Sequence, residues 1–163
     1  MRLTLLYWMA LLLPVAVSAV PDTDTVETAP IYYERMPNDL MRFFFDDRYF
    51  LTDKYCRFKA IERVGTYDTQ QQKFLGRFTD FDQSGRAILR GNYQDGKRHG
   101  EFRAYHPNAE LKWEVTYEQG KPKGIWCYYY PDGRPMLEVD YRDSSTFLKN
   151  FWDRKGRQQV KEG

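Results

Sequence analysis

Histidine and cysteine are scarce in this sequence, which has two of each in 163 residues. A metal centre or a histidine-dependent active site needs several such side chains that converge on one point. His99 and His106 both fall in segments that we expect to be turns, where a histidine needs no partner. We therefore predict no metal site and no cofactor.

The motifs of common enzyme classes are also missing. The sequence contains no glycine-rich phosphate-binding loop, and none of its serines has the setting of a nucleophile elbow. Asp46 and Asp47 are adjacent carboxylates of the kind used in acid–base catalysis. They lie between Phe-Phe-Phe and Arg-Tyr-Phe, however, and fit the polar tip of a hairpin better. The sequence therefore predicts a protein that is not an enzyme.

No part of the chain carries a concentrated charge of one sign. The net charge is +2, and Lys and Arg alternate with Asp and Glu along the chain. Binding to a phosphate backbone requires a concentrated basic face. We therefore expect no nucleic-acid partner.

Long apolar runs are confined to the start of the chain. Arg2 is followed by an apolar run over 3–17 and by Val17-Ser18-Ala19, which is the order of a secretory signal peptide. An uncleaved membrane anchor is the alternative, but the stretch from Leu3 to Val20 is barely long enough to span a bilayer and Pro14 interrupts it. We predict a signal peptide over 1–19, cleavage after Ala19, and export to the periplasm or the extracellular space.

What the sequence does contain is an internal repeat with an interval of 24 residues. Alignment of Gly76, Gly100 and Gly124 brings three copies into register, and a truncated fourth copy follows. A fixed period of this kind is the signature of a repeat architecture. The copies cover 76–99, 100–123, 124–146 and 147–163.

Each copy predicts one β-hairpin. The segments 113–117 and 137–141 alternate apolar and polar residues, which is the period of a half-buried strand. A less regular aromatic segment precedes each of them, which allows for a bulge, and a turn containing Pro or Gly joins the two. The Gly-Lys-x-x-Gly motifs at Gly96 and Gly120 are the return turns between hairpins. We therefore predict an all-β fold, an elongated antiparallel meander of hairpin repeats.

The repeated pattern Gly-x-Phe/Trp-x-x-Tyr, turn, Leu/Trp-x-Val-x-Tyr-x-x-Gly-Lys resembles the MORN repeat. The resemblance is to the variant found in exported bacterial proteins and in antitoxin components of toxin–antitoxin systems, and it covers 76–163. Departures are Ala109, where glycine is usual, and Ser144-Ser145, which replace a Gly-Lys turn. The resemblance implies an elongated meander used for binding, without shared catalytic chemistry.

The region before the repeats divides near residue 42. Residues 20–42 begin without periodicity and are predicted to be a linker and a poorly defined N-terminal segment. Residues 43–75 are predicted to hold the strands that lead into the repeats. Residues 31–50 fit either a strand pair or a short helix begun by Asn38 or Asp39, and both alternatives stay open.

Cys56 and Cys127 would be expected to pair in an exported protein. In the predicted meander, however, Cys56 opens the strand before the first repeat, and Cys127 lies five strand steps further on. At about 4.8 Å per step the separation is roughly 24 Å, whereas a disulfide tolerates at most ~7 Å between Cα atoms. We therefore predict two free thiols.

The aromatic residues fit two roles, a ligand platform or cross-strand pairs that stabilise the sheet. Tyr93, Tyr117 and Tyr141 lie on the regular strands and fit the second role. The candidates for binding lie on the irregular strands and are Phe102, Tyr105, Trp126 and Tyr129.

These features predict an exported, non-enzymatic repeat protein that binds an unknown protein partner, with an antitoxin-like inhibitor as a narrower version. The alternative is a module of the cell envelope or cell surface that contacts lipid or glycan through its aromatic face. The two predictions differ in what co-purifies with the protein: a stoichiometric protein, or vesicles and polysaccharide.

Overall fold

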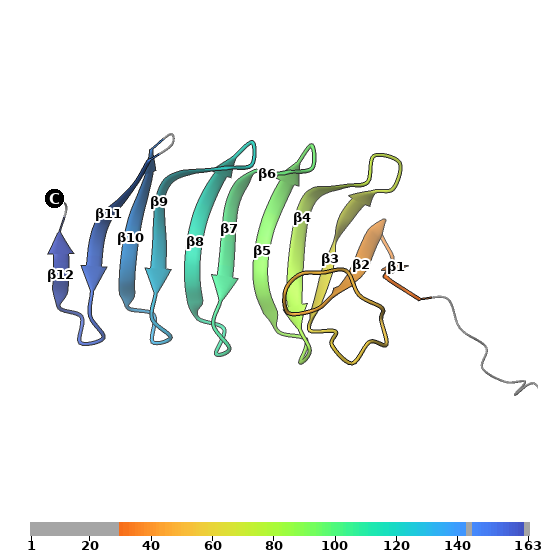
Figure 1. Ribbon diagram of the computed structural model, residues 1–163, viewed down its shortest axis with the longest axis horizontal. Coiled ribbons are helices and arrows are strands. Elements are labelled where there is room, and N and C mark those ends of the chain that lie inside the picture. Colours follow the sequence, from red (N-terminus) through yellow and green to blue (C-terminus); the bar gives the residue numbers. More distant parts are fainter. Residues whose placement is uncertain (1–29, 143–144, 162–163) are drawn as a thin grey trace, which may run out of the picture.

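The computed structural model describes residues 30–142 and 145–161, which form one open antiparallel sheet of 12 strands (Figure 1). The predicted all-β meander is therefore confirmed. The predicted signal peptide over 1–19 and the first part of the predicted linker lie outside the described residues. The strands are β1 (Tyr33–Arg35), β2 (Leu40–Phe45), β3 (Ile61–Asp68), β4 (Lys73–Asp82), β5 (Ala87–Gln94), β6 (Lys97–Arg98), β7 (Gly100–Tyr105), β8 (Leu111–Glu118), β9 (Lys121–Tyr129), β10 (Pro135–Arg142), β11 (Ser145–Trp152) and β12 (Gln158–Lys161).

The strands pair in the order in which they occur along the chain, and only the two-residue β6 lies off this path, paired with β5. Figure 1 shows them side by side in a single layer, without a helix over either face. In the described part of the chain, no helix has the length and apolar character that a membrane span requires.

Each of the first three copies of the repeat begins at a backbone irregularity. Gly76, Gly100 and Gly124 have positive φ angles of 65°, 77° and 73°, a conformation that glycine adopts without a Cβ penalty. The pairing register shifts beside Gly76 in β4 and beside Gly124 in β9, and Gly100 follows the break between β6 and β7. The 24-residue interval of the sequence is thus the interval between these irregularities.

The turns inside the hairpins share one hydrogen-bond pattern. In the turn over 82–86, the Asp82 N–H donates to the Arg86 carbonyl oxygen, and the Gly85 N–H donates to the Asp82 carbonyl oxygen, both at 2.9 Å. The turns that begin at His106, Tyr130 and Asp153 have the same two bonds. These are the turns predicted from the repeat.

The return turns between hairpins are of the left-handed type. Asp95 and Gly96 have φ angles of 54° and 76°, and Gln119 and Gly120 have 50° and 86°. Two consecutive positive φ angles are typical of the type I′ turn, whose twist matches that of the flanking strands. The Gly-Lys-x-x-Gly motifs therefore have the role expected of them.

The same turn type decides between the two alternatives left open for 31–50. Asn38 and Asp39 have φ angles of 61° and 57°, so they form a tight turn between β1 and β2 and do not begin a helix. The strand pair is the alternative that forms. As a result, β1 and the start of β2 lie within 20–42, the segment expected to be a linker and a poorly defined N-terminal segment.

Two rows of directly opposed residues cross all the strands of the main path. Opposed residues in neighbouring strands point to the same face of a sheet, so each row marks one face. We call the faces the apolar face and the polar face. The apolar row is Tyr33, Phe43, Arg63, Asp80, Leu89, Ala104, Trp113, Tyr128, Leu137, Phe151 and Val160. The polar row is Glu34, Arg42, Val64, Thr79, Arg90, Arg103, Glu114, Cys127, Glu138, Asn150 and Lys161.

The hydrophobic core lies on the apolar face, where Phe78, Phe102, Val115 and Tyr117 form a buried cluster. Phe78 and Phe102 pack directly on the backbone of Gly91. A Cβ atom at Gly91 would lie 2.6 Å from the Phe102 ring and 2.8 Å from the Phe78 ring. A residue without a side chain at this position therefore lets the two rings meet in a sheet that has no second layer.

Cys56 and Cys127 are free thiols, and five strand steps separate β3 from β9, as predicted. The position of Cys56 differs from the prediction, because β3 begins only at Ile61. Cys56 lies instead in the loop over 46–60, where its N–H donates to the Asp53 carbonyl oxygen at 3.0 Å.

Candidate functional site on the polar face

The four predicted binding residues are divided between the two faces of the sheet. Phe102 and Trp126 lie on the apolar face, and Phe102 is only 2% exposed in the core. Tyr105 and Tyr129 lie on the polar face. Within each copy the two candidates are three positions apart, Phe102 from Tyr105 and Trp126 from Tyr129, and side chains in a strand alternate between faces. The structure therefore does not bring the four residues together.

Trp126 is part of the aromatic packing on the apolar face. Its ring lies 5.7 Å from the Tyr117 ring and 4.4 Å from the Tyr141 ring, between centroids. The Tyr93 ring contacts the Phe102 ring in the same layer. These contacts agree with the stabilising role expected of the tyrosines on the regular strands.

Tyr129 holds an acidic side chain in place. Its hydroxyl donates to Glu114 Oε1 at 3.0 Å, and burial together with this hydrogen bond raises the pKa of the Tyr129 hydroxyl. Glu114 and Cys127 are opposed in the polar row. Burial, reinforced by the charge of Glu138, raises the pKa of the Cys127 thiol, so the protonated form is favoured there.

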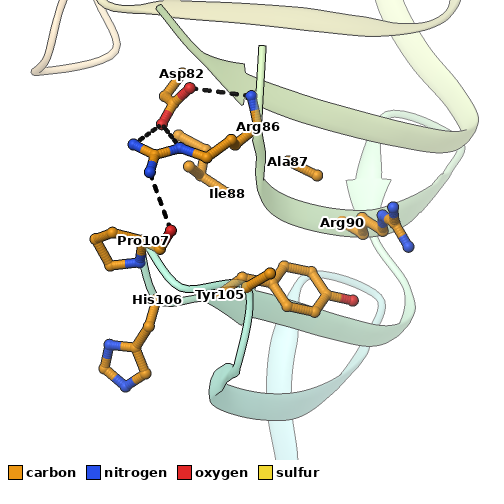
Figure 2. Close-up of a pocket in the computed structure, with 9 residues that line it drawn as sticks. Asp82, Arg86, Ala87, Ile88, Arg90, Tyr105, His106 and Pro107 are labelled. Atoms are coloured by element: carbon orange, nitrogen blue, oxygen red, sulfur yellow. Dashed lines mark hydrogen bonds and ion pairs between the residues drawn. The ribbon is translucent and has the colours of Figure 1, made fainter. Parts of the chain in front are cut away.

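Tyr105 lies at a cavity on the polar face, whereas Phe102 and Trp126 line a separate hollow of about 470 Å³ on the apolar face. Two hollows on the polar face, of about 400 Å³ and 580 Å³, are both lined by Arg90 and Tyr105. The smaller hollow lies between the turns over 82–86 and 106–109 (Figure 2), and the larger one lies over β4, β5 and β7. We call the two hollows together the groove. Its parts have the size of small-ligand sites.

Three arginines on adjacent strands surround the larger hollow. Arg90 in β5 is directly opposite Arg103 in β7, and Arg77 lies one step away in β4, opposite Asn92. Like charges directly opposite each other destabilise a sheet. Among neighbours in the polar row, Arg90 and Arg103 are the only pair of like charge.

The arginines differ in their partners. Arg103 forms ion pairs with Glu101 and, at 3.6 Å, with Glu114. The Arg90 guanidinium lies 5.5 Å from the centre of the Tyr105 ring. Within residues 30–142 and 145–161, no carboxylate is within ion-pair distance of Arg77 or Arg90. The groove therefore has an excess of positive charge.

Two acidic residues of the polar row already accept hydrogen bonds from neighbouring side chains. Glu114 accepts from Tyr129, and Glu138 accepts from Asn150 Nδ2 at 2.6 Å. His99 lines the larger hollow, and its buried Nδ1 has no hydrogen-bond partner within the part of the chain that the structure describes. Among the described residues, the groove thus combines two guanidinium groups that have no carboxylate partner, those of Arg77 and Arg90, with an imidazole nitrogen that has no hydrogen-bond partner. Guanidinium groups bind phosphate and carboxylate through paired, charge-assisted hydrogen bonds.

The remaining polar candidates have local roles. His106 lies in a turn, as expected, and its Nε2 is 2.9 Å from the Tyr129 carbonyl oxygen. Asp46 Oδ1 accepts the N–H groups of Arg48 and Phe50 at 2.9 Å, which matches a polar loop tip. Among the described residues, no group of three or more His, Cys, Asp or Glu side chains is placed to hold a metal ion.

The arginines were not predicted from the sequence, because no single column of the repeat places them together. One column of the repeat holds residues 79, 103 and 127, and another holds residues 90, 114 and 138. Residues of these two columns alternate along the polar row. Reading the two columns together places Arg90 beside Arg103. This interleaving is the signal that would have identified them.

No protein-family model and no curated protein matches this sequence. Solved structures that match part of it include the GtfA/B complex, with 18% identity and a TM-score of 0.39 over 76% of this chain and 22% of that chain. A mutant of S. aureus TarM in complex with fondaparinux, α-GlcNAc-glycerol and UDP matches with 15% identity and a TM-score of 0.41, over 72% of this chain and 21% of its own. The chain thus spans about a fifth of the length of these proteins.

These matches contradict the function predicted from the sequence. The matched proteins are glycosyltransferases, whereas we predicted a non-enzymatic module that binds a protein, with lipid or glycan contact through the aromatic face as the alternative. The prediction that the protein is not an enzyme rested on missing motifs, and many enzyme sites have no short motif. The identities and TM-scores are low, so the matches assign no activity to this chain.

Proposed function

We propose that this protein is a binding module for an anionic ligand, which it holds in the groove on the polar face. The observation that carries the proposal is the direct opposition of Arg90 and Arg103 across β5 and β7, with no carboxylate paired to Arg90 among the described residues. An anion between the two guanidinium groups would relieve their repulsion and accept charge-assisted hydrogen bonds.

The strand register defines the spacing of the anionic positions. Opposed residues have Cα atoms about 4.5–5.5 Å apart, which lets Arg90 and Arg103 share one phosphate or carboxylate group. Arg77 is diagonal to Arg90 at roughly 7–8 Å. A ligand with a second anionic group at that separation would engage both positions. Phosphate, carboxylate and sulfate groups share the chemistry required.

The groove is open to solvent, and this determines how binding depends on salt. Arg77, Arg90 and Arg103 are exposed residues, so mobile ions screen their charge within about 10 Å at 0.1 M salt. Glu101 and Glu114 also compete with the ligand for Arg103. Binding is therefore expected to be tightest at low ionic strength.

The direct test is calorimetric titration with inorganic phosphate and pyrophosphate at low salt. We expect Arg90→Gln to weaken phosphate binding by roughly tenfold or more, because a hydrogen bond to a charged group contributes ~1.5–3 kcal/mol and 1.4 kcal/mol is tenfold. Arg134→Gln is the matched control, since Arg134 is also exposed and lies in a turn away from the groove, paired with Asp132. Absence of binding by the unmodified protein, or equal loss in the two variants, would contradict the proposal.

We further propose that the chain is a MORN-repeat variant. The recurrence of positive φ angles at Gly76, Gly100 and Gly124 supports this assignment, because the glycines of the motif then occupy equivalent backbone positions. Export directed by residues 1–19 stays a prediction from the sequence.

A further inference from the structure

The groove continues past Arg90 into the smaller hollow, where the chemistry of the wall changes. Ile88, Tyr105 and Pro107 present apolar surface there, beside Ala87 and Ala109. Figure 2 shows the Tyr105 ring and the Pro107 ring on the same side of the hollow, with Ile88 across from Pro107. A charged group gains nothing from this wall, so the hollow suits an uncharged part of a ligand.

The charged groups at the rim of the hollow satisfy one another. Arg86 Nε donates to Asp82 Oδ2 at 2.9 Å, and the Asp82 carboxylate also accepts from the N–H and the hydroxyl of Ser84, at 2.9 Å and 2.6 Å. Arg86 Nη1 donates to the Pro107 carbonyl oxygen at 3.0 Å (Figure 2). Because this last bond ties the two turns together, the hollow is formed before any ligand arrives.

We infer that the ligand of the groove is a phosphate carried by a flat ring, with the ring in the smaller hollow and the phosphate at Arg90 and Arg103. This inference rests on the proposed function. Arg90 and Tyr105 line both hollows, so the ring and the anion are neighbours in the ligand, joined directly or through one atom. A ring favours the flat faces of Tyr105 and Pro107, because aromatic rings stack in offset contact. An alkyl chain would lose that contact.

The test compares three probes at low salt, inorganic phosphate, butyl phosphate and phenyl phosphate, by calorimetric titration. We expect phenyl phosphate to bind roughly two- to tenfold more tightly than butyl phosphate, because stacking adds to the contribution of the area buried. Tyr105→Leu removes the flat ring but keeps apolar bulk. This variant is expected to lose the preference for phenyl phosphate and to retain its affinity for inorganic phosphate, which also demonstrates that it is folded.

Tyr55→Leu is the control, because Tyr55 is 74% exposed in the loop over 46–60 and lies outside the groove. It should leave both affinities unchanged. The two proposals fail in different ways. If inorganic phosphate does not bind, the anionic site itself is refuted, and the inference with it. If inorganic phosphate binds but phenyl phosphate has no advantage over butyl phosphate, or keeps its advantage in Tyr105→Leu, the ring inference alone is refuted.

Discussion

Arg63 illustrates what a charged side chain requires inside a sheet of one layer. It is 9% exposed, and Asp80 beside it is 0% exposed. Two parallel hydrogen bonds of 2.7 Å and 2.8 Å join Arg63 Nε and Nη2 to the Asp80 carboxylate. The guanidinium also lies 4.4 Å from the Phe78 ring centre and 5.7 Å from that of Tyr49. Pairing and cation–π contacts together compensate for the loss of water.

Substitution of Asp80 removes the only carboxylate paired with Arg63 among the described residues. Asp80→Asn leaves the Arg63 charge buried without its counter-ion, and we expect the free energy of unfolding to fall by roughly 3–5 kcal/mol. The double variant Arg63→Met and Asp80→Leu should recover most of the loss, since it removes both charges. Urea denaturation followed by tryptophan fluorescence measures both effects. Asp132→Asn is the control, because the Asp132–Arg134 pair is exposed and such pairs contribute at most about 1 kcal/mol. Equal losses in Asp80→Asn and Asp132→Asn would contradict the role given to burial.

At the scale of the element, the hairpin turn is the unit that the chain repeats. Three of the four turns place glycine at the left-handed position, with φ angles of 77°, 81° and 78° at Gly85, Gly133 and Gly156. The second turn has Ala109 there, at 67°. A Cβ in this conformation costs about 1–2 kcal/mol, so the second copy is expected to be strained at its turn.

Ala109→Gly should therefore stabilise the protein. The relief of strain is partly offset by the greater backbone freedom of glycine in the unfolded chain, about 0.5–1 kcal/mol, so we expect a net gain of roughly 0.5–1 kcal/mol. Urea denaturation again measures the change. Ala87→Gly is the matched control, since Ala87 lies in a strand and its φ angle is not positive. It should destabilise the protein, and the same sign for both substitutions would rule out strain at Ala109.

The elements that the sequence predicted correctly depend on local chemistry. Turns with Gly, Pro and Asn recur at a fixed interval, and each specifies a hairpin without reference to the rest of the chain. The candidate site depends instead on which residues face each other between hairpins. Only two Cα pairs, at Leu89 and Arg90, connect β5 to β7, and this register follows from the break at Gly100. No local sequence pattern predicts the register between β5 and β7, so the groove at Arg90 was not predicted. Tyr105 was predicted as a binding residue only because it is aromatic.

For the whole molecule, the meander order determines which strands lose stability when part of the sheet is removed. Each strand of the main path pairs through backbone hydrogen bonds only with its neighbours in the sheet, and stability in such an array is carried mainly by nearest-neighbour interfaces. Removal of 147–163 deletes most of β11 and all of β12. We therefore expect amide protection to fall most in β9 and β10, and least in β4 and β5, as measured by hydrogen exchange.

The control for this truncation is Val160→Ala, which keeps β12 in place at the sheet edge while removing only two methyl groups. It should leave protection in β9 and β10 close to that of the intact chain. A loss of protection spread evenly from β2 to β10 in the truncated protein would show that the sheet unfolds as one unit.

The number of strands along the polar row sets the length of the sheet. Neighbouring strands are about 4.8 Å apart, and one copy of the repeat contributes two strands, so each copy extends the sheet by about 9.6 Å. A tandem duplication of 100–123 placed after residue 123 would leave Arg90 opposite the first Arg103, and would move the β12 edge away by that one increment. The number of copies therefore sets the length of the sheet, whereas the sequence of one junction, between β5 and β7, decides where along the sheet the positive charge is placed.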